Sequence, residues 1–513
     1  MTRSLPLATL TVCVLLSAAA EPPKPKHAPT PAEARLMRDV FANDLRGMLS
    51  FLSSDLLEGR DTPSRGLDLA AEYIASEFRR AGLDPGGDDG YFQTAPFEQV
   101  TPVKDGFSLS LTHDGETAAA GPQDVSLSTV DALDLDNAPV FKLDLTDKAA
   151  VSAAKPEQVD GRVVVMQSQR RGMPGAAAAF ALLQESKPAL LVMVGEESMG
   201  AGGGGQRLVD PSHPAGEGMF SVPRILVKSG PIVELLKALP TGDAKTTATV
   251  HIAAPLTAPV KLRNVVAILR GSDPVRKDTC VMVTAHYDHV GMKPGGEGDR
   301  IFNGANDDGS GTVSVVEIAR AFAASQVRPR RTVVFVAFFG EEKGDLGSHY
   351  YGTHSVFPIA NTVADINLEQ VGRTDSTEGP QLNNASLTGF GYSTVGDVLV
   401  KAGALTGVKI YKHPKNSDLY FSRSDNQALA DVGVPAHTLC VAFDYPDYHG
   451  VGDEWPKVNY ENMAKIDRTV ALALLMLADD PSTPRWNPKE PKAARYLKAW
   501  RKEHPPAPEP VGR

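Results

Sequence analysis

The chain has 513 residues, 42% of them hydrophobic, and a formal net charge of -10. This length and apolar content suit two to four folded domains and exclude an intrinsically disordered protein. Because the chain is acidic and lacks a basic run that could follow phosphates, its charge argues against nucleic acid as a partner.

The first twenty residues predict a secretory signal peptide. Arg3 precedes an apolar core from Leu5 to Leu16, and Ala18 to Ala20 supply small residues for cleavage. The apolar core is shorter than the roughly 20 residues of a membrane span, so we expect none. Arg3 before the apolar core and the alanines after it disfavour a buried N-terminal helix. Cys13 lacks the small preceding residues of a lipoprotein signal, which disfavours a lipid anchor. We therefore expect a secreted or periplasmic protein.

Residues 21–34 are rich in Pro, Lys and Ala and are interpreted as a linker. Two helices are expected next. Apolar residues recur at helical spacing from Leu45 to Leu52 and again from Leu69 to Phe78, where Gly82 ends the second helix. The stretch between them, SSDLLEGRDTPSRG, is predicted to be a loop, and both helices should cover the main sheet.

Between residues 106 and 259 the pattern changes to alternating strands, glycine-rich loops and an Ala-rich helix from Gly175 to Glu185. Acidic and histidine residues hardly cluster here. The segments VDGRVVVMQ, the Ala-rich helix, ALLVMVG and SVPRILVKSGPIVELLKAL resemble the protease-associated domain, a small β-rich module inserted in several secreted peptidases. We therefore interpret 106–259 as an inserted domain of this kind. Gly202 to Gly205 lack the strand-to-helix context of a phosphate loop and favour a surface loop.

The stretch from Cys280 to Glu342 predicts a strand, a polar loop, a helix and a second strand. Val281–Thr284 and Thr332–Phe339 are short, nearly continuous apolar runs, which is typical of strands buried on both faces. The sequence therefore predicts an α/β fold with a mixed, largely parallel central sheet covered by helices on both faces. We assign residues 35–105 and 260–480 to this domain.

Further strands are expected before Glu369 and in VPAHTLCVAF, followed by a helix from about Tyr460 to Leu477. Residues 481–513 are rich in Pro, Lys and Arg and predict a loose surface extension with a short amphipathic piece. Cys280 and Cys440 lie in apolar strands, where one disulfide or two buried free thiols are possible.

Acidic and histidine side chains follow several of the predicted strands, at the sheet edge where open α/β folds bind ligands. Two neighbouring divalent ions need a bridging carboxylate, terminal ligands on each ion and open positions for water and substrate. We interpret the following residues as such a two-metal hydrolase site: His286, Asp288, Asp307, Glu341, Glu342, Glu369 and His449.

Residue types and spacing suggest roles within this set. His286 can bind a metal while Asp288 orients its ring. Asp307 lies in a tight glycine-rich loop that suits a bridging ligand. Glu341 and Glu342 are adjacent and point different ways, so one can bind metal and the other can face the metal-bound water. Each residue alone is weak evidence, because paired glutamates are usually solvated and Asp-Asp-Gly is usually a turn.

Together these motifs resemble the secreted co-catalytic zinc aminopeptidase family, which includes bacterial leucyl aminopeptidases and, more distantly, glutamate carboxypeptidase II and glutaminyl cyclase. The resemblance covers about residues 40–105 and 260–478. It implies two zinc ions, although cobalt or manganese would suit the same donors. By this likeness one Zn²⁺ is held by His286, Asp307 and Glu369, and the other by Asp307, Glu342 and His449.

The resemblance further implies that Glu341 is the general base and that the Asp307–Asp308 peptide bond is cis. Two positions depart from the family pattern. Glu369 stands where the family often has aspartate, which changes the ligand geometry. Asn426 replaces a histidine that is not a ligand in two-zinc members, so we expect metal binding to survive. Tyr420 or a neighbour is a candidate for stabilising the oxyanion.

The resemblance thus predicts a di-zinc aminopeptidase that hydrolyses the N-terminal bond of peptides with a free N-terminus. A carboxypeptidase of the glutamate-releasing kind and a one-zinc glutaminyl cyclase are alternatives on the same fold. A non-catalytic binding protein is disfavoured, because Glu341 and the ligand set are present. The sequence indicates neither the preferred N-terminal residue nor an oligomeric state.

Overall fold

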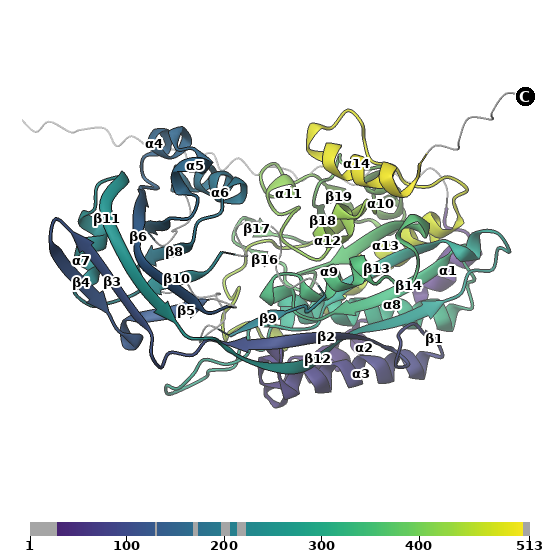
Figure 1. Cartoon of the computed structure of the whole chain (residues 1–513). Helices are drawn as coiled ribbons and strands as arrows, with labels where there is room; N and C mark the ends of the chain where they lie inside the picture. Colours follow the sequence, from purple (N-terminus) through teal and green to yellow (C-terminus); the bar gives the residue numbers. More distant parts are fainter. Residues whose placement is uncertain (1–27, 129–130, 168–172, 196–205, 213–221, 506–513) are drawn as a thin grey trace, which may run out of the picture.

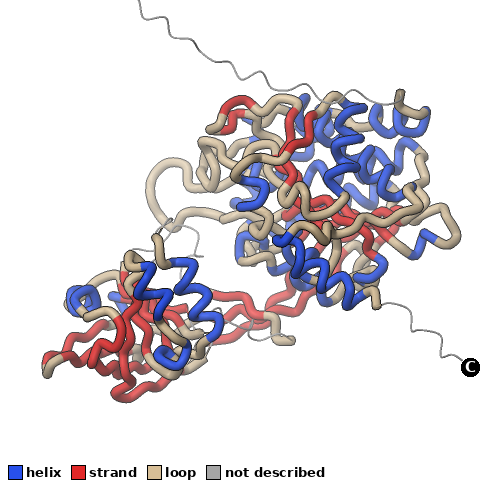
Figure 2. The backbone as a smooth tube through the Cα atoms, turned by 90° about the horizontal axis from the view of Figure 1, so that it is seen from above, coloured by secondary structure: helices blue, strands red, loops and turns tan. Residues whose placement is uncertain are grey.

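A computed structural model of the chain describes residues 28–128, 131–167, 173–195, 206–212 and 222–505. The predicted signal peptide and the glycine run 202–205 lie outside these ranges, so both stay predictions. Among the described residues, no helix is long and apolar enough to cross a membrane. The described chain forms two lobes of unequal size, joined by paired strands (Figures 1 and 2).

The larger lobe is built on a mixed sheet that has ten strands within the described residues. The central strands β20, β15, β13 and β14 run parallel, and β12 and β2 continue the sheet antiparallel. The carboxyl ends of the four parallel strands therefore meet at one edge. The spatial order is β19 (Lys409–Tyr411), β18 (Asn384–Leu387), β20 (Ala436–Cys440), β15 (Thr362–Leu368), β13 (Cys280–His286), β14 (Thr332–Phe338), β12 (Leu256–Leu269), β2 (Phe92–Thr101) and β9 (Arg207–Val209), with β1 (Asp84–Pro85) paired to β12.

Both faces of this sheet are buried, as predicted. In β13, Val281 and Val283 pack into one apolar cluster while Cys280 and Met282 pack into another on the opposite face, because successive side chains of a strand alternate in direction. The first face is covered by α1 (Pro31–Arg38), α2 (Ala42–Leu52), α3 (Arg65–Ala81), α8 (Gly311–Ser325), α10 (Val395–Thr406) and α13 (Tyr460–Asp479). The second is covered by α9 (Leu346–Thr353), α12 (Asn426–Asp431) and α14 (Ala494–Glu503).

Local sequence explains where these helices begin and end. Ser64 caps α3 by accepting a hydrogen bond of 3.1 Å from the backbone N–H of Leu67, and Gly82 ends it with a left-handed φ of 74°. Helix α8 is apolar almost all round because it is sandwiched between the sheet and other helices. Its buried Glu317 is paired with Arg320.

The smaller lobe contains a second sheet, with eight strands among the described residues. In spatial order they are β4 (Glu116–Ala120), β3 (Ser108–His113), β11 (Gly242–Ile252), β6 (Leu133–Leu143), β7 (Val163–Gln167), β8 (Leu190–Val194), β10 (Arg224–Val227) and β5 (Val125–Ser128). Helix α7 (Ile232–Ala238) packs on one face, and α4 (Lys148–Ala153) and α6 (Ala176–Glu185) pack on the other. The identity of this lobe as a protease-associated domain stays a prediction.

Strands β2 and β12 connect the lobes side by side and pair from Phe92 opposite Val265 to Thr101 opposite Leu256 (Figure 1). The second sheet falls between residues 108 and 252, inside the predicted insertion. Strand β9 also lies in that insertion but pairs with β2 of the main sheet. Residues of the predicted insertion therefore contribute to both sheets.

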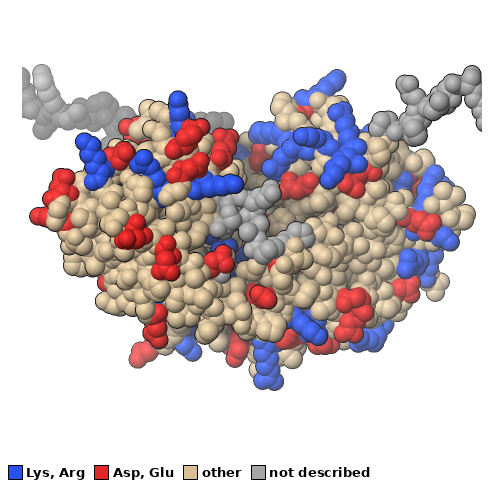
Figure 3. Space-filling view, in the orientation of Figure 1, with Lys and Arg blue, Asp and Glu red and all other residues tan. Residues whose placement is uncertain are grey.

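The prediction of a loose C-terminal extension is wrong for its described part. Trp486 and Tyr496 are 2% and 4% exposed and pack on the second face of the main sheet. The indole Nε1 of Trp486 donates a hydrogen bond of 2.8 Å to the carbonyl of Gly433. Lysines and arginines of this segment remain outside and gather on the surface above it (Figure 3).

Cys280 and Cys440 are free and buried, so the disulfide that the sequence left open is not formed. Sγ of Cys280 lies 3.5 Å from Oγ1 of Thr362. Burial raises the pKa of the Cys280 thiol to about 12, which makes it a poor nucleophile.

Candidate active site

The loops that follow the four parallel strands bring the predicted site residues together. His286 is the last residue of β13, and His289 lies three residues further on. Glu341 and Glu342 follow β14, Glu369 directly follows β15, and His449 lies in the loop after β20. Residues separated by more than 160 positions in the sequence therefore meet at one sheet edge.

Asp307 lies in the turn Ala305–Ser310 that precedes α8. Two backbone N–H groups of this turn, including that of Asp307, donate to the carboxylate of Asp453 at 3.0 and 3.1 Å. The Asp307–Asp308 peptide bond is cis, as the resemblance implied. Asp308 accepts a hydrogen bond of 3.1 Å from the backbone N–H of Gln370, which ties the turn to the loop after β15. The carboxylate of Asp307 is thus held by a rigid backbone.

The structure brings His286, Asp307 and Glu369 into one set of potential metal donors. One atom from each residue lies within 4.8 Å of the others. Nε2 of His286 is 3.6 Å from Oδ1 of Asp307. The longer side chain of Glu369 still reaches the set, so the departure from aspartate does not remove a donor.

Asp307 also belongs to a second set, together with His289, Glu342 and His449. Nε2 of His449 lies 3.1 Å from Oδ2 of Asp307 and 3.2 Å from Oε1 of Glu342. Since the two carboxylate oxygens of Asp307 face different sets, this residue has the placement of a bridging ligand. Sequence reasoning missed His289, although its position three residues after His286 offered a hint.

The donor sets fit divalent metal ions. Both ring nitrogens of His286 and of His289, and Oε1 of Glu342, are buried without a hydrogen-bond partner among the described residues. Leaving such a polar group unsatisfied costs about 1–3 kcal/mol. Imidazole and carboxylate donors are those that zinc and related divalent transition metals prefer. A cation in each set would satisfy one ring nitrogen of each histidine and Oε1 of Glu342.

Asp288 and Glu341 lie beside the sets without joining either. Oδ1 of Asp288 accepts a hydrogen bond of 3.1 Å from the backbone N–H of Glu341, and Oδ2 accepts one of 3.1 Å from Oγ1 of Thr62. Nδ1 of His286 is 3.5 Å from Oδ1 of Asp288. Asp288 is therefore placed to orient both His286 and the turn that carries Glu341; the catalytic roles of Asp288 and Glu341 stay predictions.

The surroundings of Glu341 and Glu342 shift the pKa values of these two carboxyl groups in opposite directions. Burial raises the pKa of Glu341 well above its ordinary value, although nearby His286 opposes this. Burial and the charge of Asp307 also act to raise the pKa of Glu342, but the imidazoles of His289 and His449 outweigh them and hold it at about 2.

A buried arginine holds the loops that carry these donors, and sequence reasoning missed it as well. The side chain of Arg60 is 0% exposed. Its guanidinium donates to four backbone carbonyls, those of Tyr287 (2.8 Å), Leu52 (2.7 Å), Asn303 (2.7 Å) and Gly304 (3.0 Å). Burial lowers the pKa of Arg60 to about 10, so it remains a cation near neutral pH.

The turn before Arg60 docks closely on the loop after β13. The backbone N–H of Gly291 donates to the carbonyl of Gly59 at 3.0 Å, and that of His289 donates to the carbonyl of Arg60 at 3.2 Å. Gly59 has a φ of 71°, and a Cβ there would lie 2.3 Å from the carbonyl oxygen of Gly291. Only glycine suits this position.

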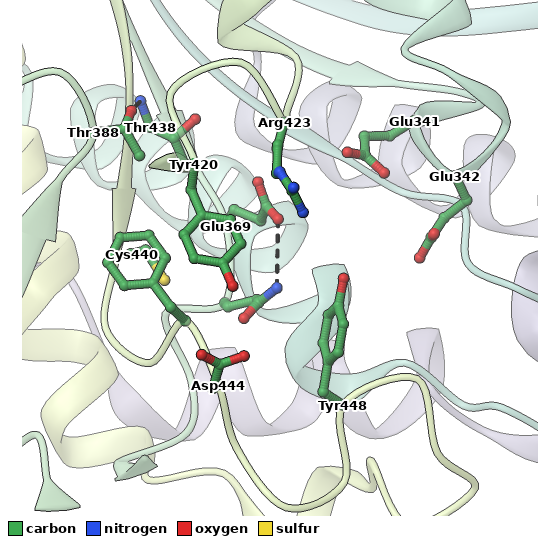
Figure 4. A pocket seen from close by; sticks show the side chains of 12 residues that line it. Glu341, Glu342, Glu369, Thr388, Tyr420, Arg423, Thr438, Cys440, Asp444 and Tyr448 are labelled. Carbon is green, nitrogen blue, oxygen red and sulfur yellow. Dashed lines mark hydrogen bonds between the residues drawn. The ribbon is translucent and has the colours of Figure 1, made fainter. Parts of the chain in front are cut away.

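A cavity of about 240 Å³ opens beside the donor sets. Figure 4 shows Glu341 and Glu342 on one side, Thr388 and Tyr420 on the other, and Arg423 projecting between them. The ring of Tyr420 stacks on Phe443 with centroids 5.0 Å apart. This cavity is large enough for a side chain and gives it access to the metal donors.

Asn426, the second departure, lies outside both donor sets. Its Nδ2 donates a hydrogen bond of 3.0 Å to the carbonyl of Phe421, and its Oδ1 accepts one of 2.8 Å from Oγ1 of Thr438. Asn426 therefore links the start of α12 to β20.

Comparisons with known proteins agree with this architecture. Residues 264–474 match the model of Peptidase family M28. A probable zinc metalloprotease of Pyrenophora teres f. teres is 39% identical over 123 residues, which are 24% of this chain and 25% of the relative. Aminopeptidase YwaD of Bacillus subtilis is 35% identical over 111 residues, 21% of this chain and 22% of the relative. The matched segment thus spans about a quarter of these curated relatives.

Solved structures share the fold over most of the chain. An aminopeptidase from Aneurinibacillus sp. strain AM-1 has a TM-score of 0.56 at 19% identity, covering 89% of this chain and 98% of that structure. The zinc aminopeptidase BSAP from Bacillus subtilis has a TM-score of 0.50 at 18% identity, covering 86% and 97%. These likenesses confirm the predicted α/β fold class.

Proposed function

We propose that the protein is a metallo-aminopeptidase that carries two zinc ions, because residues 264–474 match the model of peptidase family M28. Its substrates are peptides with a free N-terminus, and it hydrolyses their first peptide bond. The names of similar proteins, a probable zinc metalloprotease and an aminopeptidase, support both the metal and the reaction.

One observation carries the proposal. Two sets of imidazole and carboxylate donors share Asp307, and Glu341 lies beside both while belonging to neither. A site built only for structural metal uses all its donors as ligands and leaves no spare acid or base. The spare carboxyl of Glu341, next to a cavity that opens to the donors, favours a hydrolase.

The residues then have defined tasks. Divalent ions held by the two donor sets would acidify water, so that a nucleophile is available near neutral pH, and would polarise the scissile carbonyl. Glu341 takes the proton from the attacking water and passes it to the leaving amine. Oδ1 of Asp288 faces Nδ1 of His286 and accepts a hydrogen bond from the backbone N–H of Glu341, so Asp288 positions both residues. The cavity walls exclude water from the substrate side chain.

A second candidate function draws on Arg423. Its guanidinium lines the cavity and has no carboxylate partner among the described residues. An arginine in that place would pair with the C-terminal carboxylate of a substrate, as a carboxypeptidase requires. The same guanidinium would also suit an acidic N-terminal residue of an aminopeptidase substrate.

A peptide panel tests both functions. Each peptide is offered with a free and with an acetylated N-terminus, before and after treatment with a zinc chelator, and released amino acids are identified. Chelator-sensitive release of the first residue from free peptides alone supports the aminopeptidase. Release of the last residue from both forms supports the carboxypeptidase, and absence of release overturns both.

We also propose that residues 1–20 are cleaved during export, so that the mature protein acts in the periplasm or outside the cell. The Arg3 flank, the apolar core and the small residues at Ala18 to Ala20 support this. N-terminal sequencing of the protein recovered from outside the cytoplasm tests it. A mature chain that begins after Ala20 is expected, and an intact Met1 would overturn the proposal.

A further inference from the structure

His289 is the buried residue of the site whose task is still open. Its side chain is 0% exposed, and neither ring nitrogen has a hydrogen-bond partner among the described residues. Buried histidines normally pair at least one nitrogen with a carbonyl, carboxylate or hydroxyl. Within the same lobe, buried His437 does so with the carbonyl of Thr388 at 2.9 Å. His289 therefore lacks the partner that a structural histidine has.

Nδ1 of His289 is close to a carboxylate without being hydrogen-bonded to it. It lies 2.9 Å from Oε1 of Glu342, yet both atoms remain without a hydrogen-bond partner, because the contact lacks the required alignment. A ring nitrogen and a carboxylate oxygen that are close, but do not form a hydrogen bond with each other, can both bind one metal ion. Oε1 of Glu342 is also 3.2 Å from Nε2 of His449.

The ring of His289 is fixed in this place. Its backbone N–H donates to the carbonyl of Arg60 at 3.2 Å. The imidazole lies against Gly304, where a Cβ would come within 2.5 Å of the ring. Its other neighbour is His449, whose ring meets it edge to face at 5.4 Å. Close packing on these sides keeps the ring turned toward the donor set.

We propose that His289 is a fourth protein ligand of the ion held by Asp307, Glu342 and His449. The two metal sites are then unequal, with four protein donors in this set and three in the set of His286, Asp307 and Glu369. This inference rests on the proposed function, because it concerns the same metal centre. The set combines the imidazoles of His289 and His449 with the carboxylate of Glu342 and the carboxylate of Asp307, which the other set shares.

Unequal donor numbers have a functional consequence. The four-donor site binds its ion more tightly and fills first, because each added protein ligand contributes binding free energy. The three-donor site keeps more positions for water and substrate, as catalytic zinc sites do. The ion beside His286 is therefore the one that is exchanged more easily.

The competing interpretation is that His289 touches only Glu342 and orients it from outside the metal sphere. Substitution of His289 by asparagine distinguishes a metal ligand from a residue that only orients Glu342. In asparagine the amide nitrogen is attached, like Nδ1 of histidine, through one carbon to Cβ, so His289→Asn can still donate a hydrogen bond to Glu342. It has no lone pair on that nitrogen for a metal ion.

The test is a metal-binding titration of the metal-free, full-length chain. Wild type, His289→Ala and His289→Asn are titrated with Zn²⁺ against a chelating indicator, and with Co²⁺ while its visible absorption is recorded. His251→Ala removes a half-exposed histidine of the smaller lobe and is the matched control. Circular dichroism of each metal-free protein verifies the fold, and if His289→Ala does not fold, His289→Asn decides alone.

We expect two unequal binding steps in wild type and in the control. Loss of an outer partner weakens metal binding by about 10–100-fold, so both His289 variants should lose more than about 100-fold in the tighter step. The Co²⁺ spectrum of that step should change as well. Wild-type affinities and spectrum in His289→Asn would overturn the inference while leaving the proposed function intact. Failure of wild type to bind two ions would overturn both.

Discussion

Nη1 of Arg60 donates a hydrogen bond of 2.7 Å to the carbonyl oxygen of Asn303, in the segment that leads into the turn of Asp307. Nε of the same guanidinium donates one of 2.8 Å to the carbonyl of Tyr287, directly after His286. One buried side chain thus holds together the two loops that supply the first metal donors. Arg60 acts as a positioning residue for the metal centre.

Replacement of Arg60 by lysine should loosen this arrangement. A lysine ammonium lacks the planar fork that reaches four carbonyls at once, and each carbonyl left unsatisfied costs about 1–3 kcal/mol. We expect Arg60→Lys to lower the unfolding midpoint and to weaken Zn²⁺ binding. The control is Arg270→Lys, at a side chain that is 61% exposed. Unchanged metal affinity in Arg60→Lys would contradict the positioning role.

Glu341→Gln tests the assigned general base. The amide fills the same space but cannot accept a proton, so turnover should fall by roughly 10²-fold or more while metal content stays at the wild-type level. Elemental analysis and initial rates on the same sample check both parts. Near-normal turnover would remove Glu341 from the mechanism, and loss of metal would assign it to the donor set instead.

Asp307→Ala tests the bridging carboxylate. Because Asp307 is the residue common to both donor sets, its removal should weaken the binding of both ions. By comparison, Glu369→Ala should affect one ion, since Glu369 belongs to a single set. Zn²⁺ content after dialysis of the two variants gives the answer. Full metal content in Asp307→Ala would rule out a bridge.

Asp365 should make stability depend on pH. Its buried carboxylate accepts a hydrogen bond of 3.1 Å from Oγ1 of Thr284, while Oδ2 has no hydrogen-bond partner among the described residues. Burial raises its pKa well above the ordinary value. The folded chain therefore holds this proton to a higher pH than the unfolded chain does, and the group lowers stability as pH rises from about 4 through the raised pKa.

Asp365→Asn removes that titration. Relative to wild type, the variant should gain stability as pH rises above about 4, because only the wild-type carboxyl has to lose its buried proton. Chemical unfolding midpoints at several pH values measure the difference. A difference that does not change with pH would show that Asp365 is not protonated in the folded chain.

The sequence predicts the central sheet and most of the donors because their evidence is local. A strand buried on both faces is a short apolar run, as in β13 and β14, and a polar residue directly after it lies at the sheet edge. His286 and Glu369 stand at such places. The family resemblance then assigned Asp307, Glu342 and His449, which the structure brings into the same cluster.

His289 and Arg60 could not be recognised in this way, because their importance depends on partners from distant segments. Arg60 binds carbonyls at Tyr287 and Asn303, 227 and 243 positions further along the chain. No spacing in the loop SSDLLEGRDTPSRG reveals that contact. The role of His289 likewise depends on its contacts with Glu342 and His449, which lie far from it in the sequence.

The average composition of the C-terminal extension explains why the sequence wrongly predicts a loose segment there. Its many prolines and basic residues are typical of a solvated tail, but Trp486 and Tyr496 are interspersed among them and are buried. These two rings stack with centroids 5.1 Å apart and close the second face of the sheet. A few aromatic residues can dock a segment whose average composition is polar.

The most direct test of the central claim is to remove metal from the full-length protein and to restore it in steps. The rate at which the first residue is released from a free peptide is recorded against added Zn²⁺. The two-metal account predicts activity that is lost on chelation and fully recovered at about two equivalents per chain, in line with the two donor sets. Activity that survives complete removal of metal would contradict it.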